Sequence, residues 1–352
     1  MRCRRIALGL LVVAVAAGCM RSPKVTKPTV VFDEATFAAR PGTVFRVQLD
    51  DQGKPVTTVI GTPKEWQVRK EDTLLDVARY FGLGYGEITQ ANPGLDAWVP
   101  TPDAKAVVPT QWTLPCCTYQ GLVVNVAEMR LFYYRRDPAH PKELWVFTAP
   151  VGVGEPEHPT PRGVYKVRAK TENPTWVIPE SILREHIRER GDHRRVIKGG
   201  DDDNPLGRYR LSLTSKAAYA IHGTNIPWGP GMPVSHGCIR LYPEDIEKLY
   251  PLVPVGTRVE LTYQPVRIGR RGGAFYVQAS PDVYKRVKSL GDEAVRAAAR
   301  HPELRKVDRH AIRAAAERSQ GLPVALSSPD VGGVAGADGP EIAAAPQGRV
   351  AR

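Results

Sequence analysis

The sequence lacks a long hydrophobic run beyond its first twenty residues, and this excludes a polytopic membrane protein. A uniform helix-forming composition is also missing, because glycine and proline contribute 32 residues each to a chain of 352. Turn-forming residues at that density favour a turn-rich β protein over a helix bundle. The apolar fraction of 42% allows a sizeable core, and the length allows two domains with appendages.

No basic platform interleaved with aromatic residues accompanies the net charge of +12. Arg2, Arg4 and Arg5 supply part of the excess, and the stretch 265–320 holds 13 basic and 6 acidic residues. The charge is therefore concentrated at the N-terminus and in one C-terminal appendage, which argues against a nucleic-acid-binding protein. We expect no nucleic acid among its partners.

Residues 1–18 have the pattern of a secretory signal peptide. Met1–Arg5 is basic, and Ile6–Gly18, which ends before Cys19, consists of apolar or small residues. This apolar run is too short to span a bilayer comfortably. Ala16-Ala17-Gly18-Cys19 is similar to a lipoprotein cleavage site, at which Cys19 would be lipidated. Ala14-Val15-Ala16 also fits ordinary cleavage, so both alternatives stay open. We expect an exported protein whose only membrane contact would be that lipid.

Cysteine is scarce, with five in the chain, and three remain once the signal accounts for Cys3 and Cys19. Cys116 and Cys117 are adjacent, and adjacent cysteines do not bridge easily without distorting the intervening peptide. Whatever the state of that pair, Cys238 is left as the odd thiol. An exported protein that keeps a free thiol usually uses it.

Residues 64–115 show a compact strand–helix–helix–strand pattern, after an extended lead-in over 19–63. A strand is predicted over Trp66–Arg69, a helix opens at Asp72-Thr73, a second helix covers Gly86–Asn92, and Ala106–Pro109 forms the second strand. The unit resembles a LysM domain, a module that binds N-acetylglucosamine polymers such as peptidoglycan. The matching residues are Val68, Asp72-Thr73-Leu74, Val77-Ala78, Ile88, Asn92-Pro93 and Val107-Val108-Pro109.

Two departures from that resemblance are Glu71, where the family commonly has glycine, and an unusually long gap between Asn92 and the last strand. The resemblance implies peptidoglycan glycan strands as a partner. The alternative is a small α/β module that only packs on its neighbour.

From Gly121 onward, short β-branched or aromatic runs alternate with turns, which predicts an antiparallel sandwich or barrel over 119–264. Glu244–Leu252 is the one clear helix inside it, and Asn173–Gly200 is predicted as a polar flap over one end. Two amphipathic helical patterns, Asp282–Arg300 and Asp308–Ser319, predict a basic helical appendage over 265–322. The glycine- and alanine-rich tail 323–352 is expected to be disordered.

The densest chemistry lies in Ile221–Asn225 and Ser235–Leu241. A thiol needs a base to become a thiolate, and His222 and His236 lie close in sequence to Cys238. Gly237 allows close backbone approach, so neighbouring N–H groups could hold an oxyanion. Arg240 could neutralise a carboxylate of the substrate.

Other kinds of site fit less well. One cysteine and two histidines give three ligands for zinc with no obvious fourth, and Asp201–Asn204 is followed at once by Pro205, unlike a calcium loop. Gly152-Val153-Gly154 lacks the third glycine of a dinucleotide loop, since position 157 is Glu157. We therefore expect neither a metal nor a cofactor.

His222-Gly223-Thr224 with Ser235-His236-Gly237-Cys238-Ile239-Arg240 is similar to the signature of L,D-transpeptidases of the YkuD type. The resemblance covers roughly residues 60–265. Within it, supporting blocks match in the same order: Val124-Asn125-Val126, Arg130-Leu131-Phe132-Tyr133, Thr160-Pro161-Arg162-Gly163, Asn204-Pro205-Leu206-Gly207 and Pro254-Val255-Gly256-Thr257. It is closest to periplasmic enterobacterial-type enzymes that link an outer-membrane lipoprotein to peptidoglycan or form 3–3 crosslinks. The implied architecture is mainly β, a YkuD-like β-sandwich preceded by the βααβ LysM-like unit.

The resemblance also implies roles for individual residues. Cys238 attacks the meso-diaminopimelate carbonyl of a tetrapeptide stem and releases D-alanine, and His222 is the base, with the Gly223 carbonyl on its other nitrogen. His236, Gly237 and Cys238 line the oxyanion site, and Arg240 pairs with a stem carboxylate. Ser235 and Thr224 complete the implied substrate-binding set.

Three alternatives stay open at this point. An amine acceptor, either a second stem peptide or a lipoprotein lysine, would make the enzyme a transpeptidase. Water in its place would make it an L,D-carboxypeptidase or endopeptidase on the same fold. A non-catalytic peptidoglycan-binding protein is the third, although every chemical group that catalysis needs is present.

Overall fold

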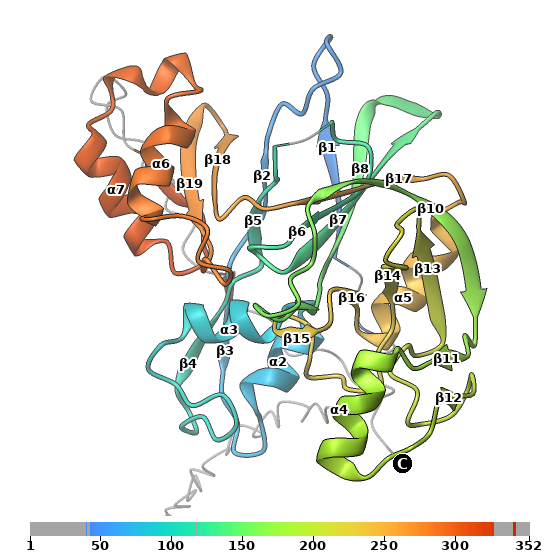
Figure 1. Cartoon of the computed structure of the whole chain (residues 1–352). Coiled ribbons are helices and arrows are strands. Elements are labelled where there is room, and N and C mark those ends of the chain that lie inside the picture. Colours follow the sequence, from blue (N-terminus) through green and yellow to red (C-terminus); the bar gives the residue numbers. More distant parts are fainter. Residues whose placement is uncertain (1–39, 41–42, 117, 327–340, 343–352) are drawn as a thin grey trace, which may run out of the picture. The chain divides into compact units, whose positions relative to one another are not determined.

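The computed structural model describes Arg40, 43–116, 118–326 and 341–342 (Figure 1). The predicted signal with Cys19, and Cys117, lie outside the described residues. Within those ranges no helix is both long and apolar enough to cross a bilayer.

A nine-stranded sheet forms the centre of the fold, and its strand order is β1-β8-β7-β6-β17-β10-β13-β14-β16. Neighbours are mostly antiparallel, but β6–β17 and β14–β16 are parallel, so the expectation of a purely antiparallel domain is wrong at these two pairs. In both parallel pairs a long stretch of chain connects the first strand to the second, as parallel pairing requires. The strands are β1 (Val44–Gln48), β6 (Gly121–Asn125), β7 (Arg130–Asp137), β8 (His140–Pro150), β10 (Gly163–Glu172), β13 (Tyr209–Leu213), β14 (Ala220–His222), β16 (Ile239–Arg240) and β17 (Arg258–Thr262).

Strand β10 joins the two halves of this sheet. Its first part, Gly163–Lys166, pairs with β17, and its later part, from Val167 on, pairs with β13 with a register shift between Val167 and Ala169. One core cluster contains side chains from both halves together with Ile246 and Leu249 of helix α5 (Pro243–Leu249). The halves therefore enclose a common core, which gives the catalytic region its sandwich-like character.

The predicted strand–helix–helix–strand order over 64–115 is present as β3 (Lys64–Gln67), α2 (Leu74–Tyr80), α3 (Tyr85–Ala91) and β4 (Lys105–Val108). Thr73 caps α2 by accepting a hydrogen bond from the Asp76 N–H at 3.0 Å. After α3, the Asn92 side chain bonds the Ile88 carbonyl and both backbone groups of Val107. These contacts fix the end of α3 against β4 despite the long loop between them.

Both faces of strands β6, β7 and β8 are buried. Leu122, Leu131 and Phe147 face the catalytic core, whereas Val123 and Phe132 belong to a second cluster. That second cluster also contains the apolar side chains of α2, α3, β3 and β4. The βααβ unit and the catalytic sheet therefore share one core, so residues 64–115 do not form a separately packed unit.

The lead-in over 19–63 takes part in this arrangement where it is described. Strand β1 pairs with β8 at the edge of the large sheet, with Val47 opposite Leu144. Strand β2 (Val59–Gly61) pairs with β5 (Gln111–Thr113). Residues 43–61 thus contribute strands and not only an extended connection.

A buried ionic network joins α3 to strand β7. The fully buried Arg130 guanidinium donates to both carboxylate oxygens of Glu87 at 2.8 Å and lies 4.2 Å from the Trp112 ring. Glu87 also accepts hydrogen bonds from the Trp112 indole and the Gly84 N–H. Because each partner would be costly to bury alone, the network holds the βααβ unit in one orientation on the sheet.

A second buried ionic cluster joins α2 to α5. Arg79 donates to both oxygens of Glu244 at 3.0 and 3.1 Å, and Arg40 pairs with the neighbouring Asp245. The Tyr242 hydroxyl donates to the Leu83 carbonyl at 3.1 Å. Helix α5 starts just after the Cys238 segment, so these contacts tie the βααβ unit to the strands that carry the predicted motif.

The C-terminal appendage is a small α/β unit, so the prediction that residues 265–322 are helical is wrong for its strands. Its three-stranded sheet consists of β18 (Val266–Arg271), β19 (Ala274–Ala279) and β20 (Val324–Leu326). Helices α6 (Leu290–Ala298) and α7 (Arg309–Arg318) pack on this sheet (Figure 1), with a 3₁₀ turn at Pro302–Lys306 between them. Gly272 and Gly273, at φ +56° and +82°, make the tight hairpin turn between β18 and β19.

The expected disorder over 323–352 is wrong for two short segments. Val324–Leu326 is strand β20, and β21 (Glu341–Ile342) pairs in parallel with β3. Both segments gain backbone hydrogen bonds from strand edges that the rest of the fold leaves available.

The predicted polar flap at Asn173–Gly200 contains a helix that the charge pattern did not indicate. Strands β11 (Trp176–Val177) and β12 (Val196–Ile197) pair at its base, and α4 (Glu180–Arg190) lies between them. Leu183 of α4 packs with Ile178 and Ile197 in a small separate core. The remaining elements are β9 (Val153–Gly154), which pairs in parallel with β15 (Pro233–Ser235), and the 3₁₀ turn Tyr250–Leu252.

Replacing Arg130 by methionine should lower the free energy of unfolding by about 3 kcal/mol, because Glu87 would stay buried without its cation. Urea unfolding at pH 7 measures the change. Arg135→Met, at an exposed position of the same strand, serves as the matched control and should change stability by less than about 0.5 kcal/mol. Equal small effects of both substitutions would contradict this role of the network.

Candidate active site

Three neighbouring strands bring the two predicted motifs together. His222 on β14 lies opposite Arg210 on β13, and on its other side it lies opposite Arg240 on β16. Residues in register on adjacent strands face the same side of a sheet. The intervening residues Leu211, Ile221 and Ile239 belong to the catalytic core. Arg210, His222 and Arg240 therefore form a row on the face away from that core.

Cys238 precedes β16 and lies two positions before Arg240, which places it on the side of the row. The backbone of Ala220, two residues before His222 on the neighbouring strand, lies close enough to the thiol to favour its thiolate form. The Leu241 N–H donates to the His222 carbonyl at 2.9 Å and continues the pairing beyond the motif. The structure thus brings the predicted nucleophile and base to adjacent positions on one face.

His222 is buried and is held by its own backbone neighbour. Its Nδ1 lies 2.7 Å from the Gly223 carbonyl, which can only accept, so Nδ1 carries the proton and Nε2 keeps its lone pair. Burial, with the charges of Arg240 and Arg210, lowers the pKa of His222 to about 3. The imidazole is therefore neutral at physiological pH, with Nε2 able to accept a proton.

The Cys238 thiol is also neutral in the resting site. Burial raises its pKa, and this effect exceeds the opposing influence of the Ala220 backbone and the charges of Arg210 and Arg240. A neutral thiol beside a neutral imidazole differs from the thiolate–imidazolium pair of many cysteine enzymes. Proton transfer must then accompany attack on the substrate.

A hydroxyl brace shapes the loop that carries Cys238. Ser235 Oγ donates to the Cys238 carbonyl at 2.6 Å and accepts from the Gly237 N–H at 3.1 Å. Gly237 has φ +104°, and a Cβ there would lie 2.6 Å from the Tyr219 ring, so this position requires glycine. The Gly237 N–H is engaged by Ser235, so in this arrangement it does not point to an oxyanion site.

Two residues without an assigned role support this loop from behind. Buried Thr160 donates its hydroxyl to the Gly237 carbonyl at 3.1 Å and accepts from the Gly154 N–H at 2.8 Å. The Tyr284 hydroxyl, from the C-terminal appendage, donates to the Gly154 carbonyl at 2.7 Å and accepts from the Thr160 N–H. Thr160 lies in a block that resembles the family, whereas no motif in the sequence pointed to Tyr284.

His236 links the loop to the flap. Its Nε2 lies 3.2 Å from Glu185 Oε2 on α4, and its ring stacks on His158 with 4.7 Å between centroids. Helix α4 therefore contacts the nucleophile loop directly. The sequence pointed to His236, but it gave no sign that a flap carboxylate would reach it.

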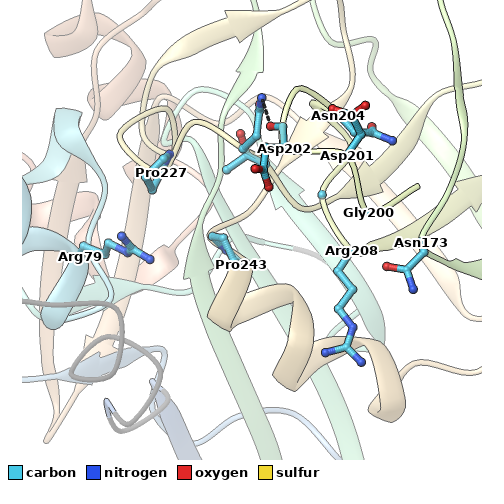
Figure 2. Close-up of a pocket in the computed structure, with 12 residues that line it drawn as sticks. Arg79, Asn173, Gly200, Asp201, Asp202, Asn204, Arg208, Pro227 and Pro243 are labelled. Atoms are coloured by element: carbon cyan, nitrogen blue, oxygen red, sulfur yellow. Dashed lines mark hydrogen bonds between the residues drawn. The ribbon is translucent and has the colours of Figure 1, made fainter. Parts of the chain in front are cut away.

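Thr224 lines a cavity near the predicted site. Its hydroxyl accepts from the Ile226 N–H at 3.0 Å, and the cavity has a volume of about 530 Å³. Figure 2 shows Asp201, Asp202 and Arg208 around this cavity, and the Asn225 amide donates to the Asp202 carbonyl. Neither Cys238 nor His222 lines it, and the substrate contact implied for Thr224 stays a prediction.

Metal-ligating side chains do not gather anywhere in the part of the chain that the structure describes. No cluster of three or more histidine, cysteine, aspartate or glutamate residues occurs within it.

The buried neutral His222 should make stability fall as the pH drops. Between its ordinary pKa of 6.5 and its folded value of about 3, the unfolded chain binds a proton that the folded chain excludes. The free energy of unfolding should therefore fall by up to about 1.4 kcal/mol per pH unit across this window. Urea unfolding of wild type and His222→Gln from pH 7.5 to 4.5 isolates this contribution. Parallel curves for the two proteins would contradict it.

The region that carries these residues is similar to known proteins. Residues 120–261 match the family model described as YkuD, the L,D-transpeptidase catalytic domain. The probable L,D-transpeptidase ErfK/SrfK of Escherichia coli is 37% identical over 260 residues, covering 71% of this chain and 81% of that protein. Its counterpart of the same name in Salmonella typhimurium is 36% identical, covering 77% of this chain and 88% of that protein.

Among solved structures, the NMR structure of the catalytic domain from the E. faecium L,D-transpeptidase covers 42% of this chain and 99% of that chain. It is 22% identical, with a TM-score of 0.31. The two sequence relatives are similar over most of their own length, and the matched region contains Cys238 and His222. The chain belongs to the L,D-transpeptidase family.

Proposed function

We propose that this L,D-transpeptidase, a cysteine acyltransferase, uses Cys238 as its nucleophile and His222 as its base. The donor is a peptidoglycan tetrapeptide stem, whose third-residue carbonyl, that of meso-diaminopimelate, becomes the acyl group. The observation that carries the assignment is the in-register placement of His222 beside the Cys238 segment, with the core on the opposite face. We propose the boundaries 64–115 for the glycan module and 119–264 for the catalytic domain.

The neutral resting pair determines how the protons move. As the Cys238 sulfur bonds to the donor carbonyl carbon, its proton passes to His222 Nε2 and the carbonyl oxygen becomes an oxyanion. The imidazolium then gives this proton to the departing amine of D-alanine as the C–N bond breaks and a thioester forms. An acceptor amine attacks the thioester carbon and loses its proton to Nε2. The C–S bond breaks as the new amide forms, and the imidazolium gives its proton to the departing Cys238 sulfur.

Charge stabilisation would come from the nucleophile loop and from the arginine beside it. Backbone N–H groups at His236 and Cys238 are the candidates to hold the oxyanion, because that of Gly237 is bonded to Ser235. Arg240 flanks His222 in the strand register and is suited to a carboxylate of the stem.

Transpeptidation should be visible in the muropeptides of tetrapeptide-rich peptidoglycan incubated with the purified protein. We expect 3–3 dimers, or an adduct when a lysine-ending acceptor peptide is added, detected by mass spectrometry. Cys238→Ala should form neither. Tripeptides alone would instead assign an L,D-carboxypeptidase, and the absence of any product would contradict the proposed reaction.

A carbapenem should form one covalent adduct with the protein, because its strained carbonyl offers Cys238 the same acyl chemistry. Intact-protein mass spectrometry should show this adduct in wild type and not in Cys238→Ala. His222→Ala should form it at least about 100-fold more slowly, since it removes the base. Cys116→Ala, at the exposed cysteine, is the matched control, and loss of the adduct there would contradict the assignment of Cys238.

We also propose that the βααβ unit is a LysM-like module that binds peptidoglycan glycan strands in an exported, periplasmic enzyme, which Cys19 would anchor if lipidated. The long loop between α3 and β4 supports this by exposing Trp98, at 56%, and Val99, at 80%. Exposed aromatic rings of this kind can stack on sugar rings. A lysine of an outer-membrane lipoprotein remains the alternative acyl acceptor to a second stem peptide.

Trp98→Ala should reduce retention of the full-length protein on purified sacculi at least several-fold, while the muropeptide reaction with soluble stems should be unchanged. Co-sedimentation measures the retention. Trp228→Ala is the matched control, because Trp228 is 53% exposed but lies outside the module. Equal retention of both variants would show that the loop does not bind glycan.

A further inference from the structure

Arg210 is a positively charged side chain at the active site that the motifs did not indicate. It lies on β13, directly opposite His222, while Arg240 lies opposite His222 on the other side. Two arginines therefore flank the imidazole across three adjacent strands. Both are close enough to influence the pKa of His222 and that of Cys238.

Neither arginine forms an ion pair within the described residues, although exposed arginines nearby such as Arg208 do form one. Burial lowers the pKa of Arg240, and the charges of Cys238 and Glu155 only partly oppose this effect. The Nε atoms of Arg210 and Arg240 are both buried and have no hydrogen-bond partner. Burying a hydrogen-bond donor without an acceptor costs free energy, and the cost is greater here because the two donors belong to neighbouring groups of the same charge.

This arrangement fits a negatively charged ligand better than a structural role. Structural arginines in this protein, such as Arg130 and Arg79, make bidentate contacts with glutamates inside the fold. Arg210 and Arg240 have no such contact and stand on the face that carries the thiol. A carboxylate is planar and accepts hydrogen bonds on both oxygens, which matches guanidinium donors.

We propose that Arg210 and Arg240 together form a receptor for one carboxylate of the donor stem, and that Arg210 makes the enzyme selective for an anionic donor. The inference rests on the proposed function. Two groups near the scissile bond carry this chemistry: the terminal carboxylate of the departing D-alanine and the side-chain carboxylate of the third residue.

Binding of that carboxylate would also prepare the base. In the free enzyme the two positive charges oppose protonation of His222. A bound carboxylate offsets them, so the imidazolium that forms during attack becomes less costly in the complex than in the free enzyme. Arg210 would thus couple donor recognition to proton transfer at Nε2.

The test measures the turnover of three soluble donors by wild type, Arg210→Gln and Arg210→Lys. The first donor is a stem with both of these carboxylates free, the second has the terminal carboxylate amidated, and the third has the side-chain carboxylate amidated. For wild type, kcat/KM should fall about 10- to 100-fold when the bound carboxylate is amidated, and the arm that falls identifies it. Arg210→Gln should show a similar loss on the free stem and little further loss on the amidated one. Arg210→Lys should recover part of the activity.

Arg168→Gln is the matched control, since Arg168 is an exposed arginine of strand β10 and Thr171, not Arg168, lies opposite Arg210, so it should leave all three rates unchanged. Thermal unfolding checks that the Arg210 variants fold. Two results would overturn the proposal while leaving the proposed function intact. In one, folded Arg210→Gln turns over the free stem with the kcat/KM of wild type; in the other, amidation lowers the kcat/KM of this variant as much as that of wild type. No turnover of any stem by wild type would overturn the proposed function, and this proposal with it.

Discussion

The burial of Leu211, Ile221 and Ile239 is the constraint on which the active site depends. These side chains belong to the core that both halves of the large sheet enclose, so strands β13, β14 and β16 have one acceptable register. A slip of one residue would turn the apolar set outward and carry His222 into the core. Alternation in three short strands therefore places an ionisable row on the opposite face without any special local structure.

Strands β6, β7 and β8 of the large sheet are buried on both sides. The back face of β6, β7 and β8 packs on the βααβ unit, and the Arg130–Glu87 pair holds the orientation. Helix α5, which follows the Cys238 strand, is tied to the same unit through Glu244 and Arg79. The module that we propose for glycan binding thus packs on the same sheet whose strands carry the nucleophile.

The sequence could predict what local pattern determines. Asp72-Thr73 and Asn92 indicated helix ends in the βααβ unit, and the spacing of His222 and Cys238 indicated a thiol–imidazole site, whose two segments the structure places side by side. It could not predict Arg210, because its position opposite His222 depends on strand pairing. Tyr284 was missed because it reaches Gly154 through tertiary packing. The hairpin at Gly272-Gly273 carried a recognisable turn signal that the neighbouring helical pattern obscured.

Both the thiol of Cys238 and the imidazole of His222 are neutral in the resting site, and the proposed proton transfers depend on this state. Nitrogen-15 NMR of the histidine ring tests it most directly, because His222 is assigned by its absence in His222→Gln. We predict the Nδ1–H tautomer, neutral at pH 7 and still neutral at pH 5, unchanged in Cys238→Ala. An imidazolium signal at pH 7 that becomes neutral in Cys238→Ala would instead establish a thiolate–imidazolium pair and contradict the account.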